Sequence, residues 1–98
     1  MTRADLEPAQ QAVQAAHALA EFWHEYPEAA RAWHGTSNTL ALLSVPDEGS
    51  LAALIEPAQW RGIELAAFRE PDRGNELTAL AIGPRGKSLC ARLRLALP

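Results

Sequence analysis

The sequence predicts a small single α/β domain that takes in the whole chain, residues 1–98. Two stretches rich in helix-forming residues alternate with three apolar runs of strand length, an order that is typical of compact α/β folds. Each run is bounded by turn residues, which favours strands that are buried on both faces. The 98 residues, 48% of them apolar, are enough for one core of modest size.

The first predicted helix covers residues 8–26. Pro8 can open it, because the first turn of a helix does not need the N–H group that proline lacks. Apolar residues at a spacing of four, three and four predict its buried face: Ala12, Ala16, Leu19 and Trp23, continued by Ala9, Val13 and Ala20. A second stripe is polar and comprises Gln10, Gln14, His17, Glu21 and His24. Pro27 ends this helix and starts a shorter one that closes before Gly35.

Residues 39–45 form the first apolar run, whose length favours a strand over a helix. Ser50 can cap the next helix, in which we expect a kink or a break at Pro57. The expected buried face of this helix consists of Leu51, Leu54, Ile55 and Ala58. Gly62 is a natural helix terminator.

Two further strands are predicted at residues 63–69 and 77–82, joined by the turn-rich segment EPDRGNE at 70–76. The C-terminal residues 88–97 show two periodicities. Three leucines at a spacing of four favour a helix, whereas alternate leucines near the end favour a strand. We therefore predict a helix that ends in an extended tail.

Charge is distributed unevenly along the chain. Residues 1–82 carry a net charge of −7, although the whole chain carries only −3. Residues 83–98 contain no acid and carry four basic residues: Arg85, Lys87, Arg92 and Arg94. A basic tail of this kind is either a solvated element or a contact for phosphate groups, and both interpretations stay open.

Several classes of protein do not fit the composition. No apolar run approaches the roughly 18–20 residues that cross a bilayer, and no basic-then-apolar leader opens the chain, so a cytoplasmic protein is expected. Cys90 is the single cysteine, which excludes an internal disulfide. His17 and His24 are about two helical turns, or roughly 10 Å, apart, so they cannot share a metal ion and we expect no metal site.

The loop at 70–76 is the most polar segment between the predicted strands, and loops at strand ends often carry function. Asp72 can act as a general base for water or orient a water molecule, and Thr78 can form a hydrogen bond with it. In the alternative interpretation the loop is a plain turn, and Thr78 is present for its β-propensity.

Three segments together resemble the type II peptidyl-tRNA hydrolases: RADL at 3–6, VQAAHA at 13–18 and TALAIGP at 78–84. The resemblance extends over nearly the whole chain. It implies a mixed sheet of about four strands with helices on both faces. It also implies hydrolysis of the ester between a peptide and the terminal ribose of tRNA, without a cofactor, in the cytoplasm.

The sequence departs from this family in three places. The family has a catalytic lysine at the position of Gln10, and the single lysine of this chain is Lys87. Either Glu70 or Asp72 can replace the family's aspartate. The chain starts where the first strand of the family is nearly complete, so that strand is expected to be shortened or missing. An exposed sheet edge would then favour a homodimer.

The resemblance and the residues together predict a site. The expected catalytic groups are Asp72 or Glu70, supported by Thr78. The expected substrate-binding residues, for a peptidyl-tRNA, are Gln10, Gln14, His17, Arg69, Asn75, Arg85 and Lys87. The alternative hypothesis is a non-catalytic module on the same scaffold that binds RNA or a protein, which the missing lysine favours.

Overall fold

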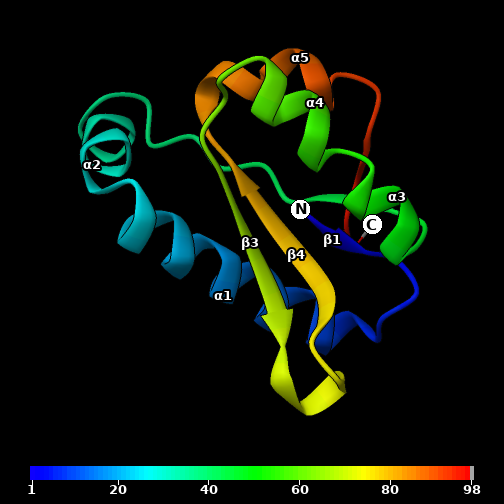
Figure 1. Ribbon diagram of the computed structural model, residues 1–98. Coiled ribbons are helices and arrows are strands. Elements are labelled where there is room, and N and C mark those ends of the chain that lie inside the picture. The colour runs from blue at the N-terminus through cyan, green and yellow to red at the C-terminus, as the bar shows by residue number, and fades with distance from the viewer. Residues whose placement is uncertain (98) are drawn as a thin grey trace.

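The computed structural model describes residues 1–97 and contains a mixed five-stranded sheet in the order β3-β4-β1-β2-β5 (Figure 1). Its strands are β1 (Thr2–Arg3), β2 (Leu43–Val45), β3 (Leu65–Glu70), β4 (Glu76–Ile82) and β5 (Arg94–Leu95). β1 pairs in parallel with β2 and antiparallel with β4. The predicted α/β domain is therefore confirmed, with one more strand than the expected four.

The helices are α1 (Pro8–Glu25), α2 (Pro27–Gly35), α3 (Glu48–Ala52), α4 (Ile55–Trp60) and α5 (Lys87–Cys90), with single 3₁₀ turns η1 (Pro71–Arg73) and η2 (Pro84–Gly86). Helix α1 packs on β3 and β4, and α3 and α4 lie on the opposite face, so the prediction of helices on both faces is confirmed (Figure 1). One apolar cluster, on the α3 face, is centred on Leu51 and Leu80. The other, on the α1 face, is centred on Phe22 and Ala66.

The first strand is shortened but not missing. β1 has two residues and occupies the interior of the sheet, between β4 and β2. Its pairing continues at Met1, whose carbonyl accepts a hydrogen bond from the Leu80 N–H at 2.9 Å. The edges of the sheet are instead β3 and β5, and the homodimer stays a prediction.

The buried face predicted for α1 is wrong. The buried residues of this helix are Gln11, Gln14, Ala18 and Phe22, whereas Val13 is 46% exposed. The apolar stripe consists mostly of alanines, so it offered little area to bury, and the large Phe22 ring decides which side of the helix meets the sheet. The helix therefore turns the polar Gln14 inward, where hydrogen bonds replace apolar packing.

Two other elements differ from the predicted ones. The strand expected at 39–45 is limited to β2, Leu43–Val45. The helix expected from Ser50 begins earlier, because the Asp47 carboxylate caps it by accepting a hydrogen bond from the Ser50 N–H at 2.9 Å. It is also interrupted before Pro57, which lies in the first turn of α4, where proline is tolerated. The extended tail after a short helix is confirmed as β5.

A β-bulge at Thr78 fixes the orientation of the side chains along β4. Phe68 of β3 pairs with Ala79 and Arg69 pairs with Leu77, so Thr78 has no partner residue on β3. Regular alternation would place Leu77 and Leu80 on opposite faces, but both pack in the cluster with Leu51. The extra residue accounts for this, and it leaves the Thr78 side chain on the α1 face.

Three side chains, two from β1 and one from α3, satisfy the backbone groups around this bulge. The Glu48 carboxylate accepts a hydrogen bond from the Leu77 N–H at 2.7 Å, and the Arg3 Nη1 group donates to the Leu77 carbonyl at 3.2 Å. The Thr2 hydroxyl donates to the Thr78 carbonyl at 3.0 Å. Buried backbone groups need partners, so these side chains replace the regular ladder bonds beside the bulge.

Arg3 is central to this arrangement. Its guanidinium is buried and pairs with Asp5 at 2.9 Å and with Glu76 at 2.7 Å. The hydrogen bonds from Arg3 lower the pKa of both carboxyl groups below their ordinary values. The ions therefore link β1, the turn before α1 and the start of β4.

Replacing Arg3 tests this link. Arg3→Met keeps an apolar stem but leaves the Leu77 carbonyl without its side-chain donor, so we expect a loss of about 1–3 kcal/mol in the free energy of unfolding. The matched control is Arg73→Met, because Arg73 lies 3.7 Å from the same Glu76 carboxylate but is solvent-exposed, and such pairs contribute about 0–1 kcal/mol. Urea denaturation of both variants measures the difference, and equal losses would contradict the link.

The stability loss caused by Arg3→Met should depend on pH. Carboxyl groups whose pKa is lower in the folded than in the unfolded state add stability above the unfolded pKa, about 4, and lose it as the pH falls through the folded pKa. The stability gap between the native protein and Arg3→Met should therefore be constant near neutral pH and narrow below about pH 4. A gap that widens in acid would exclude the assigned ion pairs.

Candidate functional site

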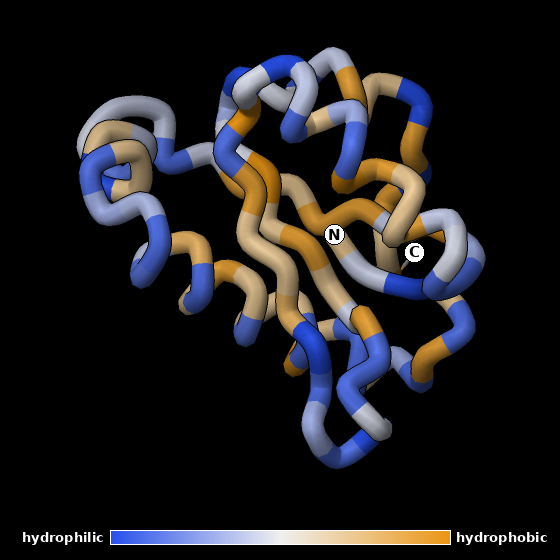
Figure 2. Tube along the Cα trace, viewed as in Figure 1, coloured by the Kyte–Doolittle hydropathy of each residue, from blue (hydrophilic) through white to orange (hydrophobic). Residues whose placement is uncertain are grey.

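An open cleft of about 400 Å³ lies between the start of α1 and the η1 turn. Its lining consists of Asp5, Leu6, Glu7, Gln10, Glu70, Asp72 and Arg73. The strands, apolar along most of their length, become hydrophilic as they approach this end (Figure 2). With four carboxylates and one guanidinium, the cleft favours neutral or cationic groups over phosphates.

The amide of Gln14 connects three elements beneath this cleft. Gln14 is fully buried, and its Oε1 atom accepts a hydrogen bond from the Thr78 hydroxyl at 2.6 Å. Its Nε2 group donates to the Glu70 carboxylate at 3.1 Å and to Gln10 Oε1 at 3.2 Å. A carboxylate can only accept, so the NH₂ group must face Glu70 and the oxygen must face Thr78. This network fixes the orientation of the amide and, through it, the position of the Glu70 carboxylate.

Local sequence explains how these groups meet. Gln10 and Gln14 are one helical turn apart, so they lie on the same side of α1. Glu70 is the last residue of β3, and Pro71 starts η1 directly after it. Thr78 reaches α1 because the bulge turns its side chain out of the α3 face. Bulges commonly redirect a side chain in this way beside functional sites.

The η1 turn positions the second carboxylate. Asp72 is exposed on η1 and lines the cleft together with Glu70. The turn closes through two residues with positive φ, Gly74 at 65° and Asn75 at 63°, and the Asn75 N–H donates to the Glu70 carbonyl at 2.9 Å. Asparagine tolerates this conformation better than most residues, so the structure places Asn75 in the turn rather than in the lining of the cleft.

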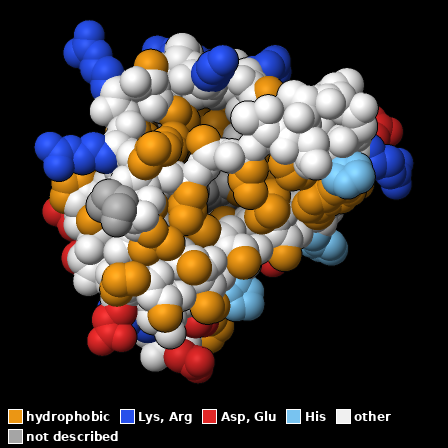
Figure 3. Space-filling model, turned by 180° about the vertical axis from the view of Figure 1, so that it is seen from behind, with side chains coloured by type: hydrophobic (Ala, Val, Ile, Leu, Met, Phe, Trp, Pro, Cys, Tyr) orange, Lys and Arg blue, Asp and Glu red, His pale blue; other side chains and the backbone are white. Residues whose placement is uncertain are grey.

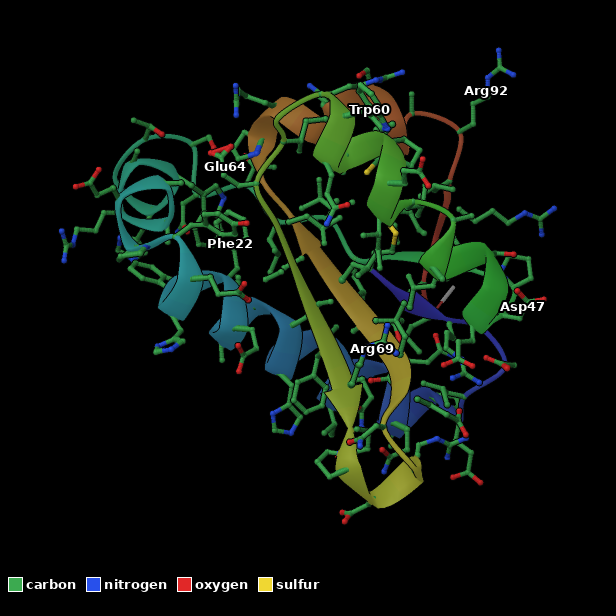
Figure 4. All side chains as sticks on the ribbon, in the orientation of Figure 1. Phe22, Asp47, Trp60, Glu64, Arg69 and Arg92 are labelled. Atoms are coloured by element: carbon green, nitrogen blue, oxygen red, sulfur yellow. The ribbon has the colours of Figure 1, made fainter. Side chains whose placement is uncertain are left out.

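The remaining predicted residues lie outside the cleft. The Arg69 guanidinium donates to the Asn75 carbonyl at 3.5 Å, and its side chain is exposed (Figure 4). The His17 ring stacks on Phe68, with ring centroids 4.5 Å apart and an angle of 10° between the planes. Arg85 and Lys87 lie at the opposite end of β3 and β4, where Arg85 pairs with Glu64 at 2.9 Å. The structure thus brings together Gln10, Gln14, Glu70, Asp72 and Thr78, and places the other five predicted side chains, including that of Asn75, elsewhere.

Sequence reasoning missed several residues around the site. Asp5, Glu7 and Arg73 line the cleft, and Glu48 and Thr2 hold the bulge. Asp5 could have been identified from the sequence, because it belongs to the RADL segment. Glu48 could not, because it is distant in sequence from Leu77 and no motif connects the two. Among residues 1–97, no group of three histidine, cysteine, aspartate or glutamate residues is arranged to hold a metal ion. No helix in that part of the chain is long and apolar enough to cross a membrane.

Replacing Thr78 tests the buried network without reference to activity. Thr78→Val keeps the shape of the side chain but leaves Gln14 Oε1 buried without its donor, so we expect a loss of about 1–3 kcal/mol in unfolding free energy. Thr78→Ser retains the hydroxyl and serves as the control, measured by the same urea denaturation. A loss in Thr78→Val no larger than that in Thr78→Ser would contradict the assigned hydrogen bond, because only valine removes the hydroxyl.

A known family matches nearly the whole chain. The sequence model of the family described as peptidyl-tRNA hydrolase PTH2 matches residues 2–97. A search of curated proteins finds no match. The matched range includes the turn between β1 and α1, the start of α1, the end of β3 and the η1 turn, which together line the cleft.

Proposed function

The chain belongs to the peptidyl-tRNA hydrolase PTH2 family, and from that premise we propose that it hydrolyses the ester between a peptide and the terminal ribose of tRNA. The observation that carries the proposal is the Glu70 carboxylate, which a fully buried amide holds at the edge of a cleft. Because this substrate arises in translation, the proposal implies a cytoplasmic protein.

The chemistry requires a group that accepts a proton from water. Glu70 Oε1 accepts the Gln14 hydrogen bond, and within residues 1–97 its Oε2 atom makes no hydrogen bond, so Oε2 can take the proton. The water oxygen then bonds to the ester carbonyl carbon, and the bond from that carbon to the ribose oxygen breaks. The proton passes from Glu70 to the leaving ribose oxygen, which restores the carboxylate.

Glu70 is the stronger candidate of the two predicted carboxylates. The Gln14 amide fixes its geometry, and a catalytic group gains from being held in place before the reaction. Asp72 lies on the exposed η1 turn, and no hydrogen bond from residues 1–97 holds its carboxylate. Asp72 then has the supporting role of a second negative charge that faces the same cleft.

Gln10 stands where the family has a lysine. Its Oε1 atom is engaged by Gln14, so its own NH₂ group is the donor that a substrate in the cleft can reach. A neutral amide can donate a hydrogen bond to the oxygen that becomes negative when water attacks, but it supplies no charge. We therefore expect a slower reaction than a lysine would support, because charge-assisted hydrogen bonds are roughly twice as strong.

A second candidate is a non-catalytic module that holds a ligand on the same scaffold. Two observations favour it: the neutral Gln10 at the lysine position and the predominance of carboxylates around the cleft. Such a module would bind its ligand without cleaving it, so the same assay distinguishes the two candidates.

The test is cleavage of N-acetylated aminoacyl-tRNA with the protein in excess over the substrate. Glu70→Gln keeps the shape of the side chain but removes the proton acceptor, so we expect the rate to fall by at least about 10²-fold. Asp72→Asn should have a smaller effect. Glu28→Gln, on the exposed surface of α2, is the matched control and should cleave like the native protein.

Two outcomes would contradict the proposal. No cleavage above the uncatalysed background by the native protein would exclude the hydrolase and leave the binding module. Cleavage by Glu70→Gln at the native rate would instead exclude Glu70 as the proton acceptor.

A further inference from the structure

Trp60 is the most exposed of the large apolar side chains identified on the surface of residues 1–97. It ends α4, and 83% of its surface is open to solvent (Figure 4). Tryptophan side chains are highly buried on average and are enriched at interfaces, so a tryptophan this exposed indicates a contact surface. Its position at the end of β3 and β4 opposite the cleft excludes a direct role in the ester chemistry.

Trp60 forms one wall of a shallow open depression of about 270 Å³. The other lining residues are Glu56 and Gln59, which belong to the same helix. An aromatic face beside an amide and a carboxylate offers a planar ligand both a stacking surface and hydrogen-bond partners at its edge. Nucleobases are planar ligands with N–H donors and carbonyl acceptors at their edges, so they fit this combination.

Basic residues follow Trp60 in the chain, although Glu56 lies beside it and Glu64 pairs with Arg85. Arg61 follows Trp60 directly, and the Arg61 guanidinium donates to Ser88 Oγ at 3.3 Å, which joins the end of α4 to α5. Exposed basic residues follow on η2, on α5 and after it: Arg85, Lys87 and Arg92. On the face that Figure 3 shows, several Lys and Arg side chains lie toward the upper end and most of the Asp and Glu side chains lie toward the lower end. We call Trp60, Arg61, Arg85, Lys87 and Arg92 the α4–α5 surface.

We propose that the α4–α5 surface binds single-stranded RNA, with an unpaired base stacked on Trp60 and the neighbouring phosphates beside Arg61 and Lys87. Proteins that bind single strands combine an aromatic stacking platform with a positively charged track, and here both occur together. Glu56 is the one acid in the depression, and it can accept a hydrogen bond from the amino group of a base. The stacking face of Trp60 beside basic side chains therefore favours RNA over an acidic or apolar partner as the occupant.

The position of the α4–α5 surface relative to the cleft indicates that the RNA contact helps to bind the tRNA substrate. This role rests on the proposed function. β3 has six residues between the two ends, and at about 3.3 Å per residue the separation is roughly 20 Å. One tRNA molecule is long enough to place its ester end in the acidic cleft and another segment on the basic surface. The RNA contact would then supply the attraction for phosphate that the cleft itself lacks.

The direct test is the affinity for a fluorescently labelled, unstructured ten-nucleotide RNA, measured by anisotropy at several salt concentrations. Trp60→Ala should weaken binding by about five- to a hundredfold, whereas Trp60→Phe, which retains an aromatic face, should stay within about threefold of the native protein. Arg61→Ala should reduce the slope of log affinity against log salt by about one. Because Trp60 and Arg61 are exposed, these variants should fold like the native protein.

Two variants serve as controls. Leu40→Ala removes an exposed apolar side chain from the loop between α2 and β2, and Arg31→Ala removes an exposed charge from α2. Both should bind the RNA like the native protein. Native affinity in Trp60→Ala, or an equal loss in Trp60→Phe, would overturn the proposal, whatever other partner the surface then proves to bind.

Cleavage assays distinguish this inference from the proposed function. Trp60→Ala should lower kcat/KM on N-acetylated aminoacyl-tRNA but not on N-acetylated aminoacyl-adenosine, which lacks the RNA body. Native cleavage of the tRNA substrate by Trp60→Ala, with unchanged RNA affinity, would overturn the inference alone. If the native protein cleaves neither substrate, the proposed function fails, and the anisotropy measurements still decide the RNA contact.

Discussion

Gln14 is a buried polar residue on the helix face that meets the sheet, and the geometry of the cleft depends on its amide. The amide accepts a hydrogen bond from Thr78 of β4 and donates to Glu70 of β3 and to Gln10 of its own helix. An unpaired amide at this depth would cost free energy, so α1 and both strands must keep these positions together. The hydrogen bonds that the buried amide requires keep α1 in position on the strands, and they also hold the Glu70 carboxylate at the cleft.

The bulge in β4 makes this hydrogen-bond network possible, and it has its own support. Without the extra residue, Thr78 would face α3 and the Gln14 oxygen would lose its donor. Arg3, Glu48 and Thr2 satisfy the backbone beside the bulge, so residues far from the cleft determine where the threonine hydroxyl lies. The short β1 strand contributes two of these three residues, which explains why two paired residues in the middle of the sheet matter to the site.

The sequence predicted the elements well and their faces less well. Proline and glycine positions located the ends of α1, α2 and α4, because these residues restrict the backbone directly. The spacing of residues did not identify the buried face of α1, because the alanine stripe and the glutamine stripe both have helical spacing. The large Phe22 side chain determines which side of the helix is buried. Thr78, Gln14 and Glu70 were identified, but their connection depends on a bulge, and a local register shift leaves no mark in hydrophobic periodicity. The separation of Arg85 and Lys87 from the cleft likewise follows from tertiary structure alone.

The central claim is that Thr78 acts on the reaction through the Gln14 amide and the Glu70 carboxylate. A double-mutant cycle tests it most directly, with cleavage rates of N-acetylated aminoacyl-tRNA measured for Thr78→Ser as the folding control, Thr78→Val, Glu70→Gln and the double variant. If the three groups act as one unit, the double variant is no slower than Glu70→Gln alone. If the two losses multiply, Thr78 contributes independently of Glu70, which would contradict the account.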